Sequence, residues 1–229
     1  MLPRVLEPEV MDTIEEAVGY DSMDHGDVNR RFVNDLLAAW RYLDPIRSVS
    51  ECLVADLGTG TALIPLLLFH REPAIGKIIA CDLAIQMLKI ANQHIQRMNA
   101  SCIQTLFCDC KQLPITDASQ DIVISNSIVH HIPKPKDVLS EAIRILKPGG
   151  LLFVRDLMRP ETNQQVEQFV QTYAKEETAE QQQLLRQSLH AALSVEEIGA
   201  MLSDLNVPAD CVKANSDRHW TICYHKSIV

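Results

Sequence analysis

The stretch Val54-Ala55-Asp56-Leu57-Gly58-Thr59-Gly60-Thr61-Ala62 decides how the rest of the chain is interpreted. The apolar run 52–55 predicts a short buried strand, and the apolar run 62–70 predicts a helix. Pro65 falls near the first turn of that helix, where a missing backbone N–H costs little. The two glycines form a turn that lets a ligand approach the backbone at the carboxyl end of a strand.

The spacing of the small residues in this turn distinguishes between ligands. Dinucleotide-binding turns follow G-x-G-x-x-G/A and wrap a pyrophosphate. The third small residue of that pattern would fall at Leu63, whereas the small residue here is Ala62. Asp56 also precedes the first glycine by two positions. These features disfavour a nicotinamide-dependent oxidoreductase, and a glycine turn that binds no ligand remains an alternative.

Size and composition favour a soluble α/β protein. The chain has 229 residues, of which 47% are hydrophobic and 22% charged, enough for one domain with additions. The net charge of -9, with no run of Lys or Arg, argues against nucleic acid as the main partner. The seven cysteines include no C-x-x-C and no zinc-type spacing, so we expect reduced, buried thiols in a cytoplasmic protein.

No secretory or membrane-spanning segment is predicted. The first residues lack the apolar core of a signal peptide, and the longest apolar run, 62–69, is too short to cross a bilayer.

Strand-like runs alternate with helical runs through the middle of the chain, which predicts a doubly wound, mostly parallel sheet. The predicted strands end at polar residues, and the carboxyl ends of parallel strands meet in one crevice. We expect strands at 77–81, 102–108, 121–126 and 151–154, and helices at 83–98 and 135–146. We therefore expect Asp56, the glycine turn, Asp82, Asp109 and Asn126 to converge there.

Four motifs in order resemble those of a known family. They are D-x-G-x-G-x-A at 56–62, Asp82 and Asp109 after the second and third strands, and S-N-S-I-V-H-H-I-P followed by L-K-P-G-G-L-L-F-V. This set resembles the class I S-adenosylmethionine (SAM)-dependent methyltransferases, in their type 11, ubiquinone/menaquinone-biosynthesis-like branch. The resemblance covers roughly residues 52–157. It implies a Rossmann-like sheet of seven strands, with an antiparallel last strand between the fifth and sixth, and an N-terminal helical cap.

The resemblance also assigns roles in cofactor binding. It implies that Asp82 binds the ribose hydroxyls of SAM, and that Asp109 with Cys110 contacts the adenine. The backbone of Gly58, Thr59 and Gly60 would face the methionine portion, and Asp56 would orient that turn. Tyr20, Leu83, Met87 and Asn126 complete the expected cofactor set. Simpler alternatives remain: Asp82 as a helix N-cap, Asp109 as a turn residue and Met87 as core.

Methyl transfer is an in-line displacement with a neutral leaving group, so alignment and exclusion of water are the main tasks. A base is needed only for an acceptor that starts protonated. His130 and His131 follow the fourth strand, and we favour His131 as the base, with a substrate-orienting role as the alternative. We further expect His25, Arg155, Asp156 and His219 to line an acceptor pocket.

The expected organisation is an N-terminal cap over 1–48 and a SAM-binding domain over 49–229, with a helical insertion at about 158–192. Residues 8–42 are predicted helical with a break at 20–26, which is either a lid or an ordinary turn. The S-x-x-E sequence at 194–197 predicts a helix N-terminus, and runs 211–215 and 220–225 predict a hairpin.

The function expected from this sequence is methyl transfer from SAM to a small-molecule acceptor, by a monomer or homodimer. The alternatives are a protein or RNA methyltransferase and a SAM-binding regulator without catalytic activity.

Overall fold

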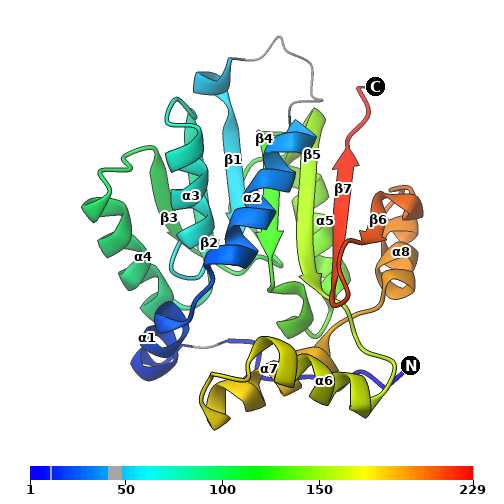
Figure 1. Cartoon of the computed structure of the whole chain (residues 1–229). Coiled ribbons are helices and arrows are strands. Elements are labelled where there is room, and N and C mark those ends of the chain that lie inside the picture. Colours follow the sequence, from blue (N-terminus) through cyan, green and yellow to red (C-terminus); the bar gives the residue numbers. More distant parts are fainter. Residues whose placement is uncertain (11, 41–47, 229) are drawn as a thin grey trace. The chain divides into compact units, whose positions relative to one another are not determined.

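Seven strands form one sheet in the order β3-β2-β1-β4-β5-β7-β6 (Figure 1). β1 pairs in parallel with β2 and β4, β2 pairs in parallel with β3, and β6 and β7 are antiparallel. The predicted Rossmann-like order, with the last strand between the fifth and sixth, is confirmed. The strands are β1 (Leu53–Leu57), β2 (Lys77–Asp82), β3 (Ile103–Phe107), β4 (Gln120–Asn126), β5 (Leu146–Leu157), β6 (Val212–Ala214) and β7 (His219–His225).

The computed structural model describes residues 1–10, 12–40 and 48–228. Its chain forms two compact units. The large unit contains residues 10–126, 137–154 and 223–229, and the small unit contains residues 1–9, 127–136 and 155–222. The helices are α1 (Ile14–Ser22), α2 (Gly26–Trp40), α3 (Leu63–Arg71), α4 (Ile85–Arg97), α5 (Pro135–Ile145), α6 (Asn163–Tyr173), α7 (Ala179–Ala191) and α8 (Val195–Asp204).

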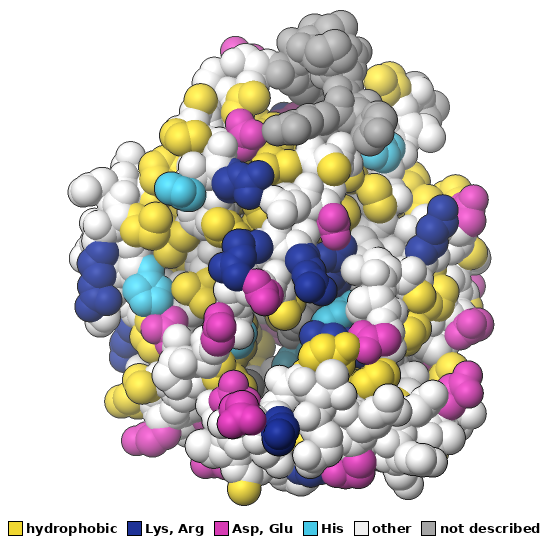
Figure 2. Space-filling view, in the orientation of Figure 1, with side chains coloured by type: hydrophobic (Ala, Val, Ile, Leu, Met, Phe, Trp, Pro, Cys, Tyr) yellow, Lys and Arg dark blue, Asp and Glu magenta, His cyan; other side chains and the backbone are white. Residues whose placement is uncertain are grey.

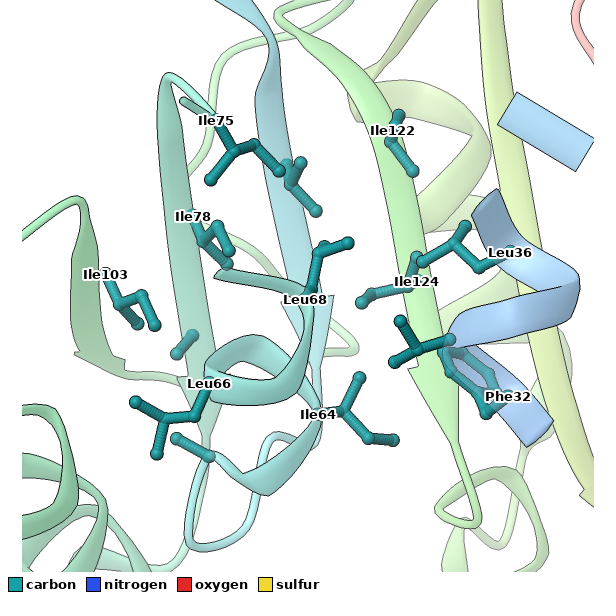
Figure 3. Packing of buried hydrophobic residues seen from close by; sticks show 14 of the residues in the cluster. Phe32, Leu36, Ile64, Leu66, Leu68, Ile75, Ile78, Ile103, Ile122 and Ile124 are labelled. Carbon is teal, nitrogen blue, oxygen red and sulfur yellow. The ribbon is translucent and has the colours of Figure 1, made fainter. Parts of the chain in front are cut away.

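The core of the large unit lies where α2, α3 and α4 cover the central strands. Strands β1 and β4 are almost wholly buried, as expected for parallel strands covered on both faces. Figure 3 shows Phe32 and Leu36 of α2 packed beside Ile124 of β4. The Phe32 ring also meets Phe153 edge-to-face at 5.2 Å between centroids. Truncating a buried Phe of this kind to Ala removes about 3–5 kcal/mol of stability.

The small unit is built on α6, α7 and α8. Its apolar cluster is centred on Leu157, Val166 and Leu189. All three helices begin at a Ser or Thr N-cap, and the predicted capping box of Ser194 and Glu197 is confirmed. The first residues of the chain belong to this unit, because the Val5 amide donates to the carbonyl of His190 at the end of α7.

Several sequence predictions need correction at this level. Ile14 and Ile85 lie on apolar stripes at helical spacing within the predicted helices 8–42 and 83–98, which suggests burial. They are instead 62% and 39% exposed, since α1 and α4 turn other side chains inward. The break in the N-terminal helices is 23–25 rather than 20–26, and residues 8–10 and 12–13 are not helical. Residues 41 and 42, at the end of the predicted helical stretch, lie outside the described ranges.

β5 is longer than predicted because it begins directly after α5. The Pro-Gly-Gly sequence at 148–150 was expected to separate helix from strand, yet it lies inside β5. Gly149 takes a left-handed φ of 74°, its amide donates to the carbonyl of Lys226, and the Lys226 amide donates to the carbonyl of Gly150. Pairing with the chain end therefore satisfies a backbone that the local sequence favours as a turn.

Candidate functional site

The glycine turn between β1 and α3 is tied to the neighbouring strand. Gly58, Gly60 and Ala62 all adopt left-handed φ values, of 72°, 55° and 63°. The amides of Gly58 and Thr59 both donate to the carbonyl of Cys81 at the end of β2, at 2.9 and 2.8 Å. For Ala62 this conformation costs roughly 1–2 kcal/mol, a kind of strain that concentrates at functional sites.

A cavity of about 310 Å³ opens on this turn, and we call it the glycine-turn cavity. Its lining combines the turn with the ends of β1 and β4 and with residues from α1, α2 and α3. The lining residues are Tyr20, Asn29, Asp56, Gly58, Thr59, Thr61, Leu63, Ile64 and Asn126.

Two buried polar atoms of this lining have no hydrogen-bond partner among the described residues: Thr61 Oγ1 and Asn126 Oδ1. Leaving a buried polar group unpaired costs about 1–3 kcal/mol. Buried polar groups in native structures are nearly always paired with protein, water, an ion or a ligand, so two such atoms around one space mark a place for a polar partner. The glycine-turn cavity is therefore suited to a polar ligand.

The cavity is also electrostatically suited to positive charge. Burial raises the pKa of Asp56 to about 7, a shift that Asp82 adds to and the Thr59 hydroxyl opposes. Burial, with Asp82 and Asp56, raises the pKa of Tyr20 to about 12. A cationic group in the cavity would favour the ionised form of Asp56 and relieve part of this desolvation penalty.

Asp82 connects the glycine turn to the start of α4 through hydrogen bonds. Its carboxylate accepts from the amides of Gly60 at 2.7 Å and Ala84 at 2.8 Å. The N-cap of α4 is Ala84, so Asp82 is not a simple helix cap. A carboxylate has about four acceptor positions, and these two bonds leave capacity for further donors.

Tyr20 joins the cavity to the N-terminal helices. Its ring stacks on His25 at 4.4 Å between centroids, and His25 Nε2 lies 2.8 Å from the Tyr20 carbonyl. The ring also lies 3.5 Å from the position that a Cβ on Gly60 would occupy. Met87 packs in a small cluster with Ala17 and Ala84 and does not line the cavity.

The remaining predicted cofactor residues lie outside the cavity lining. Leu83 follows Asp82, and Asp109 is engaged by the amide of Lys111 at 2.8 Å and its ammonium at 3.0 Å. Cys110 is buried. Hydrogen bonds from the thiols of Cys110 and Cys81 lower the pKa of Cys108 to about 4. Cys52, Cys81, Cys108 and Cys110 are buried, as predicted, whereas Cys102, Cys211 and Cys223 are only partly buried.

The predicted acceptor-side residues of the small unit form a second cluster. His130 Nδ1 is hydrogen-bonded to the carboxylate of Asp156, which also accepts from the His130 amide at 3.1 Å. Burial alone would lower the pKa of His130, but Asp156 outweighs this effect and raises it. Glu7 lies beside both histidines, at 3.4 Å from His130 Nε2 and 3.1 Å from His131 Nδ1. We call Glu7, His130, His131 and Asp156 the histidine cluster.

Two other predicted acceptor residues are held by close neighbours. Arg155 Nε donates to Thr221 Oγ1 at 2.8 Å, and His219 Nδ1 lies 2.9 Å from Ser216 Oγ. Burial, with Arg218 beside it, lowers the pKa of His219 to about 4, so this imidazole is neutral at physiological pH.

Sequence reasoning missed residues in both places. Thr61 and Asn29 line the cavity, and Thr61 could have been found because it lies inside the quoted turn motif. Glu7 carries no local signal, since its partners lie far along the chain. Basic and acidic side chains lie close together on the face that Figure 2 shows. Within residues 1–10, 12–40 and 48–228, no helix is both long and apolar enough to cross a membrane.

Comparisons with known proteins agree on the type of domain. Residues 55–154 match the family described as a methyltransferase domain, of type 11. An arsenite methyltransferase from Aquipseudomonas alcaligenes is 31% identical over 143 residues, which cover 59% of this chain and 40% of that protein. A demethylmenaquinone methyltransferase from Chlamydia caviae is 33% identical over 114 residues, covering 50% of this chain and 47% of that protein. The chain thus spans less than half the length of these curated relatives.

A solved structure supports the fold over nearly the whole chain. A SAM-dependent methyltransferase from Aquifex aeolicus superposes with a TM-score of 0.64, covering 93% of this chain and 98% of that one. The identity is 16%, so this likeness concerns the fold alone.

Proposed function

We propose, from the premise that residues 55–154 form a type 11 methyltransferase domain of the SAM-dependent class I family, that this chain transfers a methyl group from SAM to a small-molecule acceptor. The observation that carries the proposal is the glycine-turn cavity, where two partnerless polar atoms adjoin the buried carboxyl of Asp56. SAM is polar and cationic, and both properties match this lining.

In this proposal, different residues of the chain bind different parts of the cofactor. The backbone of Gly58, Thr59 and Gly60 faces the methionine portion, with Asp56 and Asn126 beside it. The free acceptor positions of Asp82 receive the ribose hydroxyls. Asp109 and Cys110 contact the adenine, and Tyr20 covers the turn. Leu83 and Met87 support the nucleoside side from the start of α4.

Bound SAM supplies a methyl group on a cationic sulfur, whose departure as a neutral thioether is favourable. The protein therefore needs mainly to align the acceptor with the methyl carbon and to keep water away. The new bond forms from the acceptor atom to the methyl carbon as the carbon–sulfur bond breaks.

The proton of a protic acceptor goes to His131 in this proposal, with His130 and Asp156 as its supports. The pair follows Asn126 by four and five positions in the chain, and His131 is the more exposed of the two, at 22% against 3%. His25, Arg155 and His219 are proposed to contact the acceptor.

Cofactor binding is tested by thermal unfolding with SAM, with NAD as the control ligand. At about 100 times its dissociation constant a specific ligand adds roughly 2.7 kcal/mol, which raises the midpoint by about 5–10 °C for a chain of this size. We expect this shift with SAM, no shift with NAD, and loss of the SAM shift in Asp56→Asn and Asp82→Ala. Asp210→Asn, on an exposed residue, is the matched control. No shift with SAM would overturn the proposal.

Transfer is tested by measuring S-adenosylhomocysteine formation with separate panels of phenols, carboxylic acids, thiols, peptides and RNA. Turnover with one small-molecule class supports the proposal. Turnover with peptide or RNA alone would show that the acceptor is a protein or RNA and not a small molecule. Binding of SAM without turnover on any panel would favour a SAM-binding regulator without catalytic activity.

A further inference from the structure

Three atoms of the kind that bind metals converge in the small unit. Glu7, His130 and His131 each offer one such atom, and these three atoms lie within 4.8 Å of one another. The Glu7 oxygen is 3.4 Å from the His130 nitrogen and 3.1 Å from the His131 nitrogen. The two imidazole rings lie 4.1 Å apart between centroids, tilted by 34°. Two nitrogens and one carboxylate oxygen thus face a common point.

These atoms do not satisfy one another. Glu7 Oε1 and His131 Nδ1 are buried and have no hydrogen-bond partner among the residues that the structure describes. The side chains of Glu7 and His130 are only 6% and 3% exposed. A carboxylate oxygen and an imidazole lone pair this close repel each other unless a proton or a cation lies between them. The geometry is poor for direct hydrogen bonds and better for a shared cation.

The surroundings fix two of the three groups in orientation. Asp156 binds His130 at Nδ1, so in the neutral imidazole the proton is on Nδ1 and the Nε2 lone pair, on the side of Glu7, is available to a cation. A carboxylate behind a histidine in this way is the usual outer partner of a metal-binding imidazole. On the other side, Ser188 Oγ donates to Glu7 Oε2 at 3.2 Å, which turns Oε1 toward the histidines.

The N-terminal segment is itself anchored, so Glu7 does not depend on these contacts alone. The Arg4 guanidinium donates to the carbonyls of His130 at 3.0 Å, Ile132 at 2.9 Å and Ala191 at 2.7 Å. The Val5 amide adds a bond to His190. The cluster is therefore assembled before any ligand arrives, which lowers the entropic cost of binding.

We propose that Glu7, His130 and His131 bind a divalent transition-metal cation of the Zn²⁺ class. In a tetrahedral site with bonds of about 2.0–2.1 Å, neighbouring ligand atoms lie roughly 3.3 Å apart. The two distances at Glu7 Oε1 match this spacing. Imidazole nitrogens with one carboxylate suit zinc, iron or cobalt better than magnesium or calcium, which prefer oxygen ligands throughout. Three protein ligands leave a coordination position open, on the side where His131 is 22% exposed.

This site does not depend on the proposed methyl transfer. It does change the acceptor side of that proposal, because in the metal-loaded form His131 is a ligand and not the proton acceptor. Metal binding and cofactor binding can be measured separately, so the two proposals fail independently.

The test uses the full chain, stripped with a chelator and titrated with Zn²⁺ by calorimetry and with Co²⁺ by visible absorption. We expect one cation per chain and Co²⁺ bands typical of low coordination number. Glu7→Gln and His131→Gln should each weaken Zn²⁺ binding at least tenfold. Glu180→Gln and His70→Gln, which change exposed residues of the same types, should leave it unaltered.

Absence of stoichiometric Zn²⁺ binding by the wild-type chain would overturn the inference. So would equal Zn²⁺ affinity in wild type, Glu7→Gln and His131→Gln. Circular dichroism and the thermal shift with SAM establish that each variant is folded. A variant that keeps the SAM shift but loses Zn²⁺ isolates the metal site. A wild type that binds Zn²⁺ but not SAM would support the metal site while refuting the proposed function.

Discussion

The glycine-turn cavity and the histidine cluster differ in whether their buried polar groups have hydrogen-bond partners. The cavity leaves Thr61 and Asn126 with partnerless atoms and surrounds the Asp56 carboxyl, whose pKa burial raises. In the cluster, His130 and Asp156 are bonded to each other, and partnerless atoms remain only where Glu7 faces His131 among the described residues. Unpaired polar groups identify where an external ligand belongs, whereas paired groups contribute to the stability of the fold.

The largest expected effect is on the free energy of unfolding, when the buried pair of His130 and Asp156 in the histidine cluster is broken. Asp156→Asn keeps the shape of the side chain but removes the charge that faces His130, in a pair that is 0% and 3% exposed. Breaking a buried pair removes about 3–5 kcal/mol, so we expect a loss of about 3 kcal/mol in urea unfolding, because Asn retains an acceptor. A loss below about 1 kcal/mol would show that the two regions do not differ in this way.

The same substitution in the cavity should act with the opposite sign. The folded pKa of Asp56 is raised from 3.8 to about 7, so the stability of the protonated form is lost as pH rises through 7. Asp56→Asn should therefore stabilise the unliganded chain by up to about 4 kcal/mol at pH 8, with little effect near pH 4. Urea unfolding at both pH values measures this, and destabilisation at pH 8 would contradict it.

The affinity for SAM should depend on pH through the same carboxyl. If the ionised form of Asp56 binds the cationic ligand, the dissociation constant rises about tenfold between pH 8 and pH 6, because binding must then displace a proton. Calorimetry of wild type and Asp56→Asn measures this change. A wild-type curve as flat as that of the variant would exclude Asp56 from the binding site.

The smallest effects come from two threonines. Thr221→Val removes a hydroxyl that is bonded to Arg155 and should lower stability by about 1 kcal/mol, with no change in SAM affinity. Thr61→Val removes a partnerless hydroxyl and should leave stability unchanged but weaken SAM binding about fivefold, which is also about 1 kcal/mol. Denaturant unfolding measures the stability of both variants, and calorimetry measures their affinity for SAM. Equal changes of stability and affinity in the two variants would contradict the contrast between paired and partnerless hydroxyls.

The mostly parallel sheet and the crevice at its strand ends were predictable because their signals are local, whereas the order of the strands followed from the family resemblance. The turn at 58–60 lies between its own strand and helix, and strand ends reveal the polar residues that parallel pairing brings together. Local periodicity was less reliable for burial, since Ile14 and Ile85 fit apolar stripes but point to solvent. The choice of face depends on packing with distant elements, which periodicity alone does not specify.

The histidine cluster was only half predictable for the same reason. His130 and His131 stood out beside a predicted strand, and Asp156 followed the next one. Arg4 and Glu7 lie in a segment with neither periodicity nor motif, and Arg4 reaches the His130 carbonyl across 126 positions of sequence. A contact of that range leaves no trace in neighbouring residues, so only the folded chain reveals it.

The large sequence separation between the N-terminal segment and the residues it contacts has a consequence during biosynthesis. Glu7 is translated 181 positions before its partner Ser188. At roughly 5–20 residues per second, the segment waits on the order of 9–36 s before its binding surface exists. Docking of the N-terminal segment is therefore a late step of maturation, completed only after most of the chain has been translated.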